Sequence, residues 1–321
     1  MEIDGSWGEG GGQVLRTSMS LAAILGFSIR IINIRSKRHP SGLQPQHLMA
    51  CRAAAAVSNG LLEGGIKNSH ELFFIPSKIT GGNYTFDIGT AGTTILVAQT
   101  LIPILLHAAK PSIVRIIGGT HLPKSPSYDY FDQVFLPAIR CFGAGVSAKM
   151  IQPGYYPVGG GVVELRISPS TLSGNCDWKG DDTLHAIIRS SKLREERKIG
   201  QREASFLFQR GVQDIRLIDE NALSQANSLT LWRGYRGACN LGERGKLAEK
   251  VTEELWNSFE NETAEVDGHL ADQLLIYASL SIGKSSYRTA HHSSHLKTNG
   301  DIIRQFLKKN ITFAGETVSI Q

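Results

Sequence analysis

The stretch "EIDGSWGEGGGQVLRTSMSLAAILG", residues 2–26, contains a β-favouring lead-in, a glycine-rich turn and a helical pattern, in that order. The helix is predicted because the apolar residues Val14, Leu21 and Leu25 recur at helical spacing. Gly26 follows directly and is a plausible C-terminal stop, since glycine adopts the left-handed conformation that ends many helices. The stretch therefore indicates one strand–turn–helix unit.

The same order of features recurs in two later stretches. They are "TFDIGTAGTTILVAQTLIPILLH", residues 85–107, and "AEVDGHLADQLLIYASL", residues 264–280. Each predicted helix carries one glutamine, at Gln13, Gln99 and Gln273 respectively. Recurrence of a short unit is typical of a duplicated architecture, so we interpret the chain as repeated α+β units.

The remaining sequence completes this outline. Alternating or β-branched runs predict further strands, and Pro45 marks the first turn of another helix. From residue 181 to 264 charge rises and the apolar runs shorten, which indicates an inserted small domain. We therefore expect an α+β fold with its repeated core in residues 1–180 and 265–321 and an insert in residues 181–264. The expected strands cover residues 28–34, 112–119, 159–169 and 317–321.

Composition limits the possible functions. The 321-residue chain has a formal net charge of +5, which fits an anionic partner such as a nucleotide or RNA. The most apolar run, residues 93–109, is interrupted by Gln99, Pro103 and His107, so it predicts a buried helix and no membrane partner. The N-terminus lacks secretory-signal features. Four scattered cysteines favour reduced thiols and a cytoplasmic location.

The glycine turn "GSWGEGGGQ", residues 5–13, is a candidate phosphate site. Consecutive glycines let backbone N–H groups approach a phosphate at a helix N-terminus. The turn lacks the P-loop lysine, and Gln13 breaks the dinucleotide-binding fingerprint, so a flexible turn stays the alternative. Glu9 could hold a divalent metal or orient a base. Gln13 and Arg16, three residues apart, share one helical face beside the turn.

Two further polar segments are candidates for contacts with a nucleotide. The loop "IRSKRHPSGLQPQH", residues 34–47, carries Arg38 and Gln46 and is either a solvated basic loop or a phosphate-contacting one. The segment "HLADQ", residues 269–273, opens a predicted helix. Its acid, Asp272, either compensates the helix dipole or contacts a nucleotide.

Three histidines lie close together in "YRTAHHSSHLKTNGD", residues 287–301, which we interpret as a short strand running into a loop. A zinc site of the H-E-x-x-H type needs a glutamate between two histidines on a helix, and none is present here. Two interpretations of these histidines stay open: surface residues without a role, or a nucleophilic histidine. Both Asp-Gly pairs are preceded by glutamate, Glu2 or Glu265, where lysine-dependent nucleotidyl ligases carry lysine.

Seven motifs follow one another along the chain: "DGSWGEGGGQVLR", "SGLQPQH", "IGTAGTTILVAQTLIP", "GGTHLPKSPSYDYF", "YYPVGGGVVE", "HLADQL" and "AHHSSHLKTN". This order is the one seen in the RNA 3′-terminal phosphate cyclases, which the sequence resembles from the N-terminus to about residue 167 and again from about residue 265. The resemblance implies repeated units of two helices packed on a four-stranded sheet, with a smaller α/β domain inserted before the last unit.

The resemblance also implies a reaction. A histidine attacks ATP, AMP passes from it to an RNA 3′-phosphate end, and the neighbouring 2′-hydroxyl closes a 2′,3′-cyclic phosphate with release of AMP. The nucleophile falls on His295. Mg²⁺ or Mn²⁺ would assist, with Glu9 as the metal residue. Contacts with ATP and its phosphates fall on Gln13, Arg16, Arg38, Gln46, Gln99, His269, Leu270, Ala271, Asp272 and Gln273.

The sequence departs from the family pattern at a few positions. Ser294 stands where cysteine is frequent and His292 where proline is frequent, and neither change removes the nucleophile. Leu122 replaces a more polar residue in a segment that the resemblance links to the RNA end. The alternatives are a non-catalytic ribosome-assembly relative, an enolpyruvyl transferase and a zinc hydrolase. The presence of His295 favours the cyclase.

Overall fold

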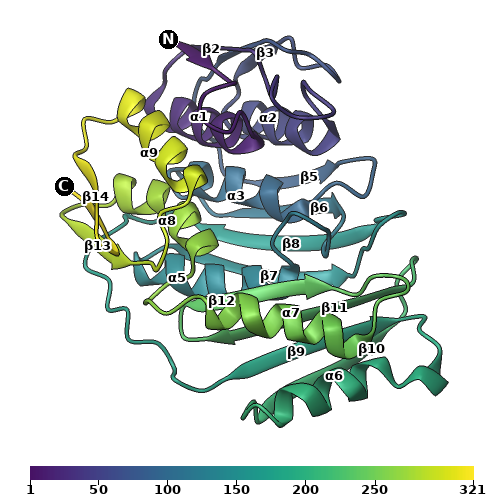
Figure 1. Cartoon of the computed structure of the whole chain (residues 1–321). Helices are drawn as coiled ribbons and strands as arrows, with labels where there is room; N and C mark the ends of the chain where they lie inside the picture. The colour runs from purple at the N-terminus through teal and green to yellow at the C-terminus, as the bar shows by residue number, and fades with distance from the viewer.

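The N-terminal stretch forms the expected strand, turn and helix in the computed structural model, which describes residues 1–321. Strand β1 (Glu2–Asp4) leads into helix α1 (Gly12–Leu25). The helix ends at Gly26, whose φ of 72° is the left-handed conformation predicted for its C-cap. Helices and sheets alternate through the chain, so the predicted α+β class is confirmed (Figure 1).

The first sheet has four strands in the order β1-β2-β4-β3. Strands β1 and β2 are parallel, and the other neighbours are antiparallel. Helix α1 connects the parallel pair and α2 connects β2 to β3, and the two helices lie side by side in Figure 1. The elements after α1 are β2 (Ile29–Ile32), α2 (Pro45–Val57), β3 (Leu61–Glu63) and β4 (Leu72–Ile75).

The second sheet repeats this pattern, with order β5-β6-β8-β7 and one parallel pair, β5 with β6. Helix α3 follows its first strand as α1 follows β1, and a composite helical segment precedes β7. The elements are β5 (Asn83–Asp87), α3 (Thr94–Leu105), β6 (Ser112–Gly118), α4 (Tyr128–Tyr130), η1 (Phe131–Phe135), α5 (Leu136–Cys141), β7 (Gly145–Gln152) and β8 (Gly161–Ser168).

The C-terminal sheet has three strands, in the order β13-β15-β14, where the resemblance implied four. A single parallel bridge between Val266 and Thr289 stands where a first strand would pair. Because Val266 also bridges Tyr235 of another segment, the extended stretch before α8 is shared between two neighbours. The elements are α8 (Gly268–Leu280), β13 (Ser285–Arg288), α9 (Ser294–Phe306), β14 (Ile311–Ala314) and β15 (Thr317–Ile320).

A fourth sheet, with order β10-β9-β11-β12, lies between the second and third sheets in sequence. It has a small hydrophobic cluster of its own, which includes Leu207, Leu229 and Phe259. The charged run 192–198 forms a loop and the short 3₁₀ helix η2 (Glu195–Arg197). The other elements are β9 (His185–Ser191), α6 (Ile199–Phe208), β10 (Asp214–Glu220), β11 (Ala226–Arg233), β12 (Arg236–Leu241) and α7 (Ala248–Glu260).

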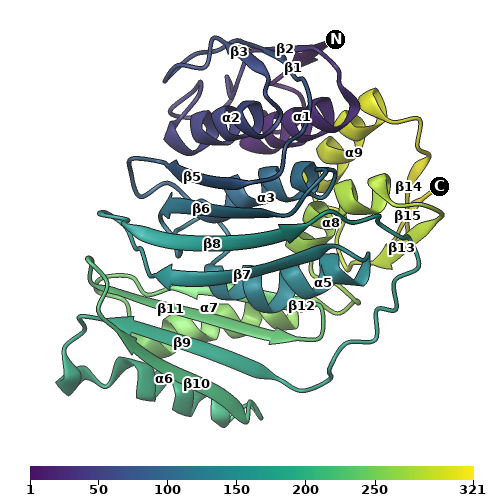
Figure 2. The ribbon, with the colours of Figure 1, turned by 180° about the vertical axis from the view of Figure 1, so that it is seen from behind.

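The main core forms where helices α1, α3, α8 and α9 pack together between the first three sheets (Figures 1 and 2). Helix α3 is apolar on almost every side and is buried, as the sequence predicted for residues 93–109. The four cysteines are free. None of the helices combines the length and apolar character needed to cross a bilayer. The packed helices bring the three glycine- and glutamine-bearing stretches together.

Candidate active site

The segment that carries the three histidines does not end in a loop, as we expected, but begins helix α9 at Ser294. The hydroxyl of Ser293 caps the helix by accepting a 3.0 Å hydrogen bond from the N–H of Leu296. The expectation was wrong because the first turns of α9 are polar and hide the helical spacing. His295 therefore lies in the first turn, on the same face as Asn299, four residues later.

The three histidines occupy separate environments. His291 is exposed in the loop before α9. The ring of His292 packs 5.5 Å from that of Phe313, centroid to centroid. The side chain of His295 is 45% exposed, and its Nε2 lies 2.7 Å from Oε2 of Glu9. No three His, Cys, Asp or Glu side chains of residues 1–321 are grouped so that they could hold a metal ion.

The glycine turn lies directly against the helix that carries His295. A Cβ on Gly8 would lie 2.0 Å from Oγ1 of Thr298, and one on Gly12 would lie 2.5 Å from Nε2 of His47. Side chains at these two positions would collide with α9 or with α2. Since no side chain caps the first N–H groups of α1, they are free to bind an anion.

Glu9, in this turn, contacts two other predicted site residues, Arg38 and His295. Its Oε2 accepts a 3.0 Å hydrogen bond from Nη2 of Arg38 and contacts Nε2 of His295 at 2.7 Å. Its Oε1 accepts a hydrogen bond from the hydroxyl of Ser294. The carboxylate thus ties the basic loop to the start of α9.

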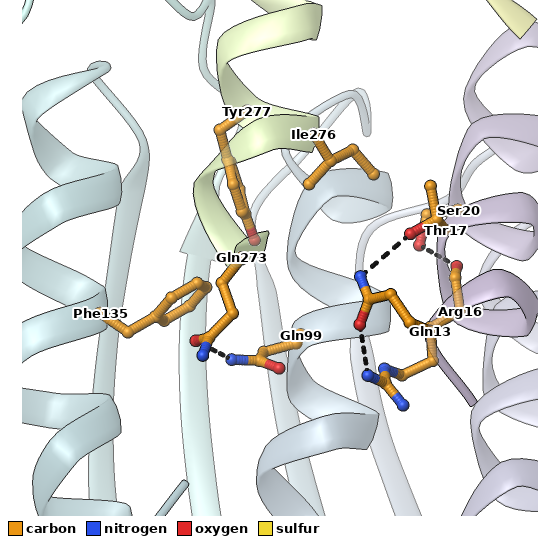
Figure 3. A pocket seen from close by; sticks show the side chains of 9 residues that line it. All are labelled: Gln13, Arg16, Thr17, Ser20, Gln99, Phe135, Gln273, Ile276 and Tyr277. Atoms are coloured by element: carbon orange, nitrogen blue, oxygen red, sulfur yellow. Dashed lines mark hydrogen bonds between the residues drawn. The ribbon is translucent and has the colours of Figure 1, made fainter. Parts of the chain in front are cut away.

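Four of the predicted residues line one recess between helices α1, α3 and α8, of about 330 Å³ including its open mouth (Figure 3): Gln13, Arg16, Gln99 and Gln273. Across it, Nε2 of Gln99 donates to Oε1 of Gln273 at 2.6 Å, and Nη2 of Arg16 donates to Oε1 of Gln13 at 2.5 Å. The recess has polar side chains on the α1 side and aromatic ones opposite. The other lining residues are Thr17, Ser20, Phe135, Ile276 and Tyr277.

Asn299, which the sequence analysis missed, joins the recess to the helix of His295. Its Nδ2 donates to the main-chain oxygen of Asp272 at 2.9 Å and to Oδ1 of the same residue at 3.0 Å. Its Oδ1 accepts a 2.7 Å hydrogen bond from Thr17, whose hydroxyl also accepts from Gln13. The i, i+4 relation to His295 would have identified Asn299 had the helix been predicted.

A model of one protein family, described as RNA 3′-terminal phosphate cyclase, matches residues 7–313, which span nearly the whole chain. The chain belongs to the RNA 3′-terminal phosphate cyclase family. The family assignment agrees with the resemblance found from the motifs, and the matched residues include the whole fourth sheet.

Relatives that carry the family name are similar over their full length. The RNA 3′-terminal phosphate cyclase of Archaeoglobus fulgidus is 39% identical, with 100% of both chains covered. That of Saccharolobus solfataricus is 40% identical, over 98% of this chain and 97% of the relative. A solved EPSP synthase from Acinetobacter baumannii is 12% identical, with a TM-score of 0.42 over 96% of this chain and 44% of its own, too low to bear on function.

The electrostatics of this cyclase-family site favour an anionic ligand. Burial lowers the pKa of Arg16 to about 10, while Asp272 opposes the shift, so the guanidinium is protonated at neutral pH. Burial raises the pKa of Asp272, and His295 and Arg16 counteract the rise. Burial, together with Arg35 and Arg16, lowers the pKa of His47 to about 3, so this imidazole is neutral. The recess thus pairs a partly buried cation with neutral hydrogen-bonding groups.

Some predicted contacts lie elsewhere. Leu270 and Ala271 are fully buried in the core, so their side chains support α8 and do not line the recess. His269 is exposed on the first turn of α8, and its N–H donates to the N-cap, Asp267, at 3.0 Å. Gln46 accepts a 3.0 Å hydrogen bond from the N–H of Thr93, at the start of α3. Gln46 thus contacts the N-terminus of α3, and neither Gln46 nor His269 lines the recess.

Proposed function

We propose that this protein converts the 3′-phosphate end of an RNA into a 2′,3′-cyclic phosphate at the expense of ATP. Membership of the cyclase family supports this activity. The observation that carries the proposal is the partly exposed imidazole of His295, fixed by Glu9 at 2.7 Å beside a glycine turn and Arg38. A nucleophile, a cation and free helix N–H groups then face the same point.

We also propose a division of the chain into a core and an insert. Three related units form the core, in residues 1–180 and 265–321, and residues 181–264 are the insert. The support is the shared strand order of the first two sheets and the analogous place of α1, α3 and α8 in their units. Each of these helices supplies one glutamine, Gln13, Gln99 or Gln273, to the same recess. Such a repeat would explain why the site forms where the units meet.

In the proposed first step, a nitrogen lone pair of His295 attacks the α-phosphorus of ATP. A nitrogen–phosphorus bond forms, the bond from the α-phosphorus to the bridging oxygen breaks, and pyrophosphate leaves. Oε2 of Glu9, 2.7 Å from Nε2, holds the ring in position. The attack uses the unprotonated nitrogen of a neutral imidazole, and the other ring nitrogen keeps its proton, so no proton has to leave for the nitrogen–phosphorus bond to form.

The next two steps use the covalent AMP. An oxygen of the RNA 3′-phosphate attacks the phosphorus of histidine-bound AMP, and the nitrogen–phosphorus bond breaks. The 2′-hydroxyl oxygen then attacks the RNA phosphorus, loses its proton and expels AMP. This closure requires little beyond orientation, because nucleophile and phosphate belong to the same nucleotide. Arg38, 41% exposed at its side chain, is placed to orient the RNA phosphate.

The recess is the proposed nucleotide site. Gln99 and Gln273 offer amide groups to a base or ribose, and Arg16 offers a cation to phosphate oxygens. The buried rings of Tyr277 and Phe135 close the inner side of the recess. A divalent metal would be held by Glu9 together with phosphate oxygens, where it would neutralise charge on the leaving pyrophosphate. One protein carboxylate fits this role, because Mg²⁺ commonly binds through one or two carboxylates plus phosphates.

Formation of the covalent intermediate tests the proposal. Incubation with α-labelled ATP and Mg²⁺ or Mn²⁺ should give a protein–AMP adduct that is acid-labile and alkali-stable, as expected for phosphorus bound to nitrogen. His295→Ala should abolish the adduct, while His291→Ala and His292→Ala, the matched controls, should retain it. An adduct that survives His295→Ala would overturn the assignment of the nucleophile. No adduct in the wild type would favour a non-catalytic relative.

A further inference from the structure

A second, larger hollow lies outside the recess, at the junction of the second sheet and the fourth. This groove has a volume of about 970 Å³, including its open mouth. Three parts of the chain form it: the segment 121–127 after β6, the connection between β7 and β8, and the adjoining ends of β11 and β12. Its side chains include Lys124, Ser125, Tyr155, Tyr156, Gln225 and Asn227.

A buried ionic network lies behind one wall of the groove, which two of its members, His121 and Tyr155, line. Nε2 of His121 lies 3.1 Å from Asp129, and Arg189 makes two hydrogen bonds to the same carboxylate, at 2.7 and 2.9 Å. Arg189 also contacts Glu220 at 2.9 Å, and the hydroxyl of Tyr155 donates to Glu220. Because Arg189 and Glu220 belong to the fourth sheet and Asp129 to α4, the two sides of the groove are locked together.

A series of side-chain contacts links the groove to the candidate active site. The hydroxyls of Ser125, in the groove, and Thr93 lie 2.7 Å apart, and the N–H of Thr93 donates to Gln46. His47, which follows Gln46, lies against the glycine turn, because a Cβ added to Gly12 would be 2.5 Å from its Nε2. The wall of the groove is therefore connected to the glycine turn through these residues.

The surface chemistry of the groove fits single-stranded nucleic acid. Tyr156 is 71% exposed, so the face of its ring is open for a base to stack on. Lys124 and Gln225 are exposed and make no hydrogen bond or ion pair within the chain. The one acidic side chain lining the groove, Glu243, has Lys246 at 3.5 Å. A stacking ring and a free ammonium group are the two elements that hold single strands without regard to sequence.

We propose that this groove binds the RNA nucleotides immediately upstream of the 3′-phosphate, with a base stacked on Tyr156 and a backbone phosphate contacted by Lys124. The inference rests on the proposed function, because it takes the end of the RNA to lie beside His295. It assigns a role to the fourth sheet, whose Gln225 and Asn227 form the far side of the groove. The site is sequence-tolerant because every base offers a face for stacking.

The test compares binding of a fluorescein-labelled hexaribonucleotide that ends in a 3′-phosphate with uptake of labelled AMP in the absence of RNA. Tyr156→Ala and Lys124→Ala should each weaken binding of the hexamer about tenfold. Both should leave AMP uptake and the melting temperature unchanged. Competition by a nucleoside 3′-phosphate, which is too short to reach the groove, should also be unchanged. Phe208→Ala is the control, because Phe208 is 66% exposed on α6 and does not line the groove.

Each other outcome overturns the assignment. Unchanged affinity for the hexamer in both variants would show that the RNA runs elsewhere. An equal loss of AMP uptake would show that the groove serves the ATP site. Weaker competition by the nucleoside 3′-phosphate would place Tyr156 at the terminal nucleotide. RNA binding is measured without turnover, so the two assays fail independently. A wild type that binds RNA but takes up no AMP would refute the proposed function, while the affinities of Tyr156→Ala and Lys124→Ala for the hexamer would still decide whether the groove binds RNA.

Discussion

The hydroxyl of Thr17 donates a 2.7 Å hydrogen bond to Oδ1 of Asn299, across 282 positions of sequence. The amide nitrogen of Asn299 in turn donates to Asp272, so α1, α8 and α9 meet at one buried polar point. His295 projects from the same face of α9 one turn earlier. The first and last units of the chain therefore set the direction of the candidate nucleophile together.

Asn299→Ala should weaken both stability and adduct formation. The substitution leaves the Asp272 carboxylate and the Thr17 hydroxyl without their buried partner, which should lower the free energy of unfolding by about 2 kcal/mol. A looser α9 should slow AMP uptake about tenfold. Urea unfolding and the rate of label uptake measure the two effects. Asn310→Ala, at an exposed asparagine, is the control, and normal uptake in a destabilised Asn299→Ala protein would limit Asn299 to a structural role.

Gln99 and Gln273 should act as a pair in ATP binding. Their side chains share a 2.6 Å hydrogen bond across the recess, so removal of either amide leaves the other without its partner. Each alanine substitution should raise the KM for ATP in AMP uptake about fivefold, and the double variant should cost less than the sum of the two free energies. Gln201→Ala, at an exposed position of α6, should have no effect. Strict additivity would mean that the two glutamines act independently.

Arg189 should be the strongest single link between the fourth sheet and α4. Its side chain is 11% exposed and faces Asp129, which is 3% exposed, and Glu220. Arg189→Met removes the cation that two buried carboxylates share and should lower the free energy of unfolding by about 3–5 kcal/mol. Arg115→Met is the comparison, because Arg115 is 59% exposed in its pair with Glu164 and should cost less than about 1 kcal/mol. Equal losses for the two variants, measured by urea unfolding, would contradict this.

Local sequence was sufficient for the helices that open the repeated stretches. Apolar spacing predicted α1, α3 and α8, and the glycine at the end of α1 has the expected conformation. Helix α9 was missed because Thr298, Asn299 and Gly300 are weak helix formers and only packing makes them helical. Gly300 lies so close to Phe313 that a Cβ would be 3.0 Å from the ring. Tertiary contacts, and not local sequence, therefore determine that this segment is helical.

The candidate site likewise combines residues that local sequence could identify with residues that only the folded structure brings in. Polar residues beside glycine turns identified Glu9, Gln13 and Arg16, because their chemistry is unusual in those positions. Tyr277 and Phe135, which line the recess, have the apolar spacing of core residues and give no separate signal in sequence. The groove was not visible at all, since its walls come from loops that are distant in sequence and meet only in the folded chain.

The remaining prediction concerns Glu203 on α6, a carboxyl group buried beneath the fourth sheet. Burial raises its pKa to about 7 from an ordinary value of 4.5, and a 2.9 Å hydrogen bond from Asn227 opposes the shift. Its Oε1 has no hydrogen-bond partner. Between about pH 4.5 and 7 the folded chain therefore binds more protons at this group than the unfolded chain, so the free energy of unfolding falls as pH rises.

Glu203→Gln should remove this dependence, because glutamine keeps an oxygen for Asn227 and has no proton to lose. Between pH 5 and pH 8 the wild type should lose up to about 3 kcal/mol of unfolding free energy relative to the variant. Urea unfolding at both pH values measures the difference. Glu260→Gln, at an exposed residue of α7, should follow the wild type. Parallel pH profiles for the wild type and Glu203→Gln would mean that Glu203 titrates as an ordinary carboxyl group, and that its burial is relieved by solvent in the folded protein.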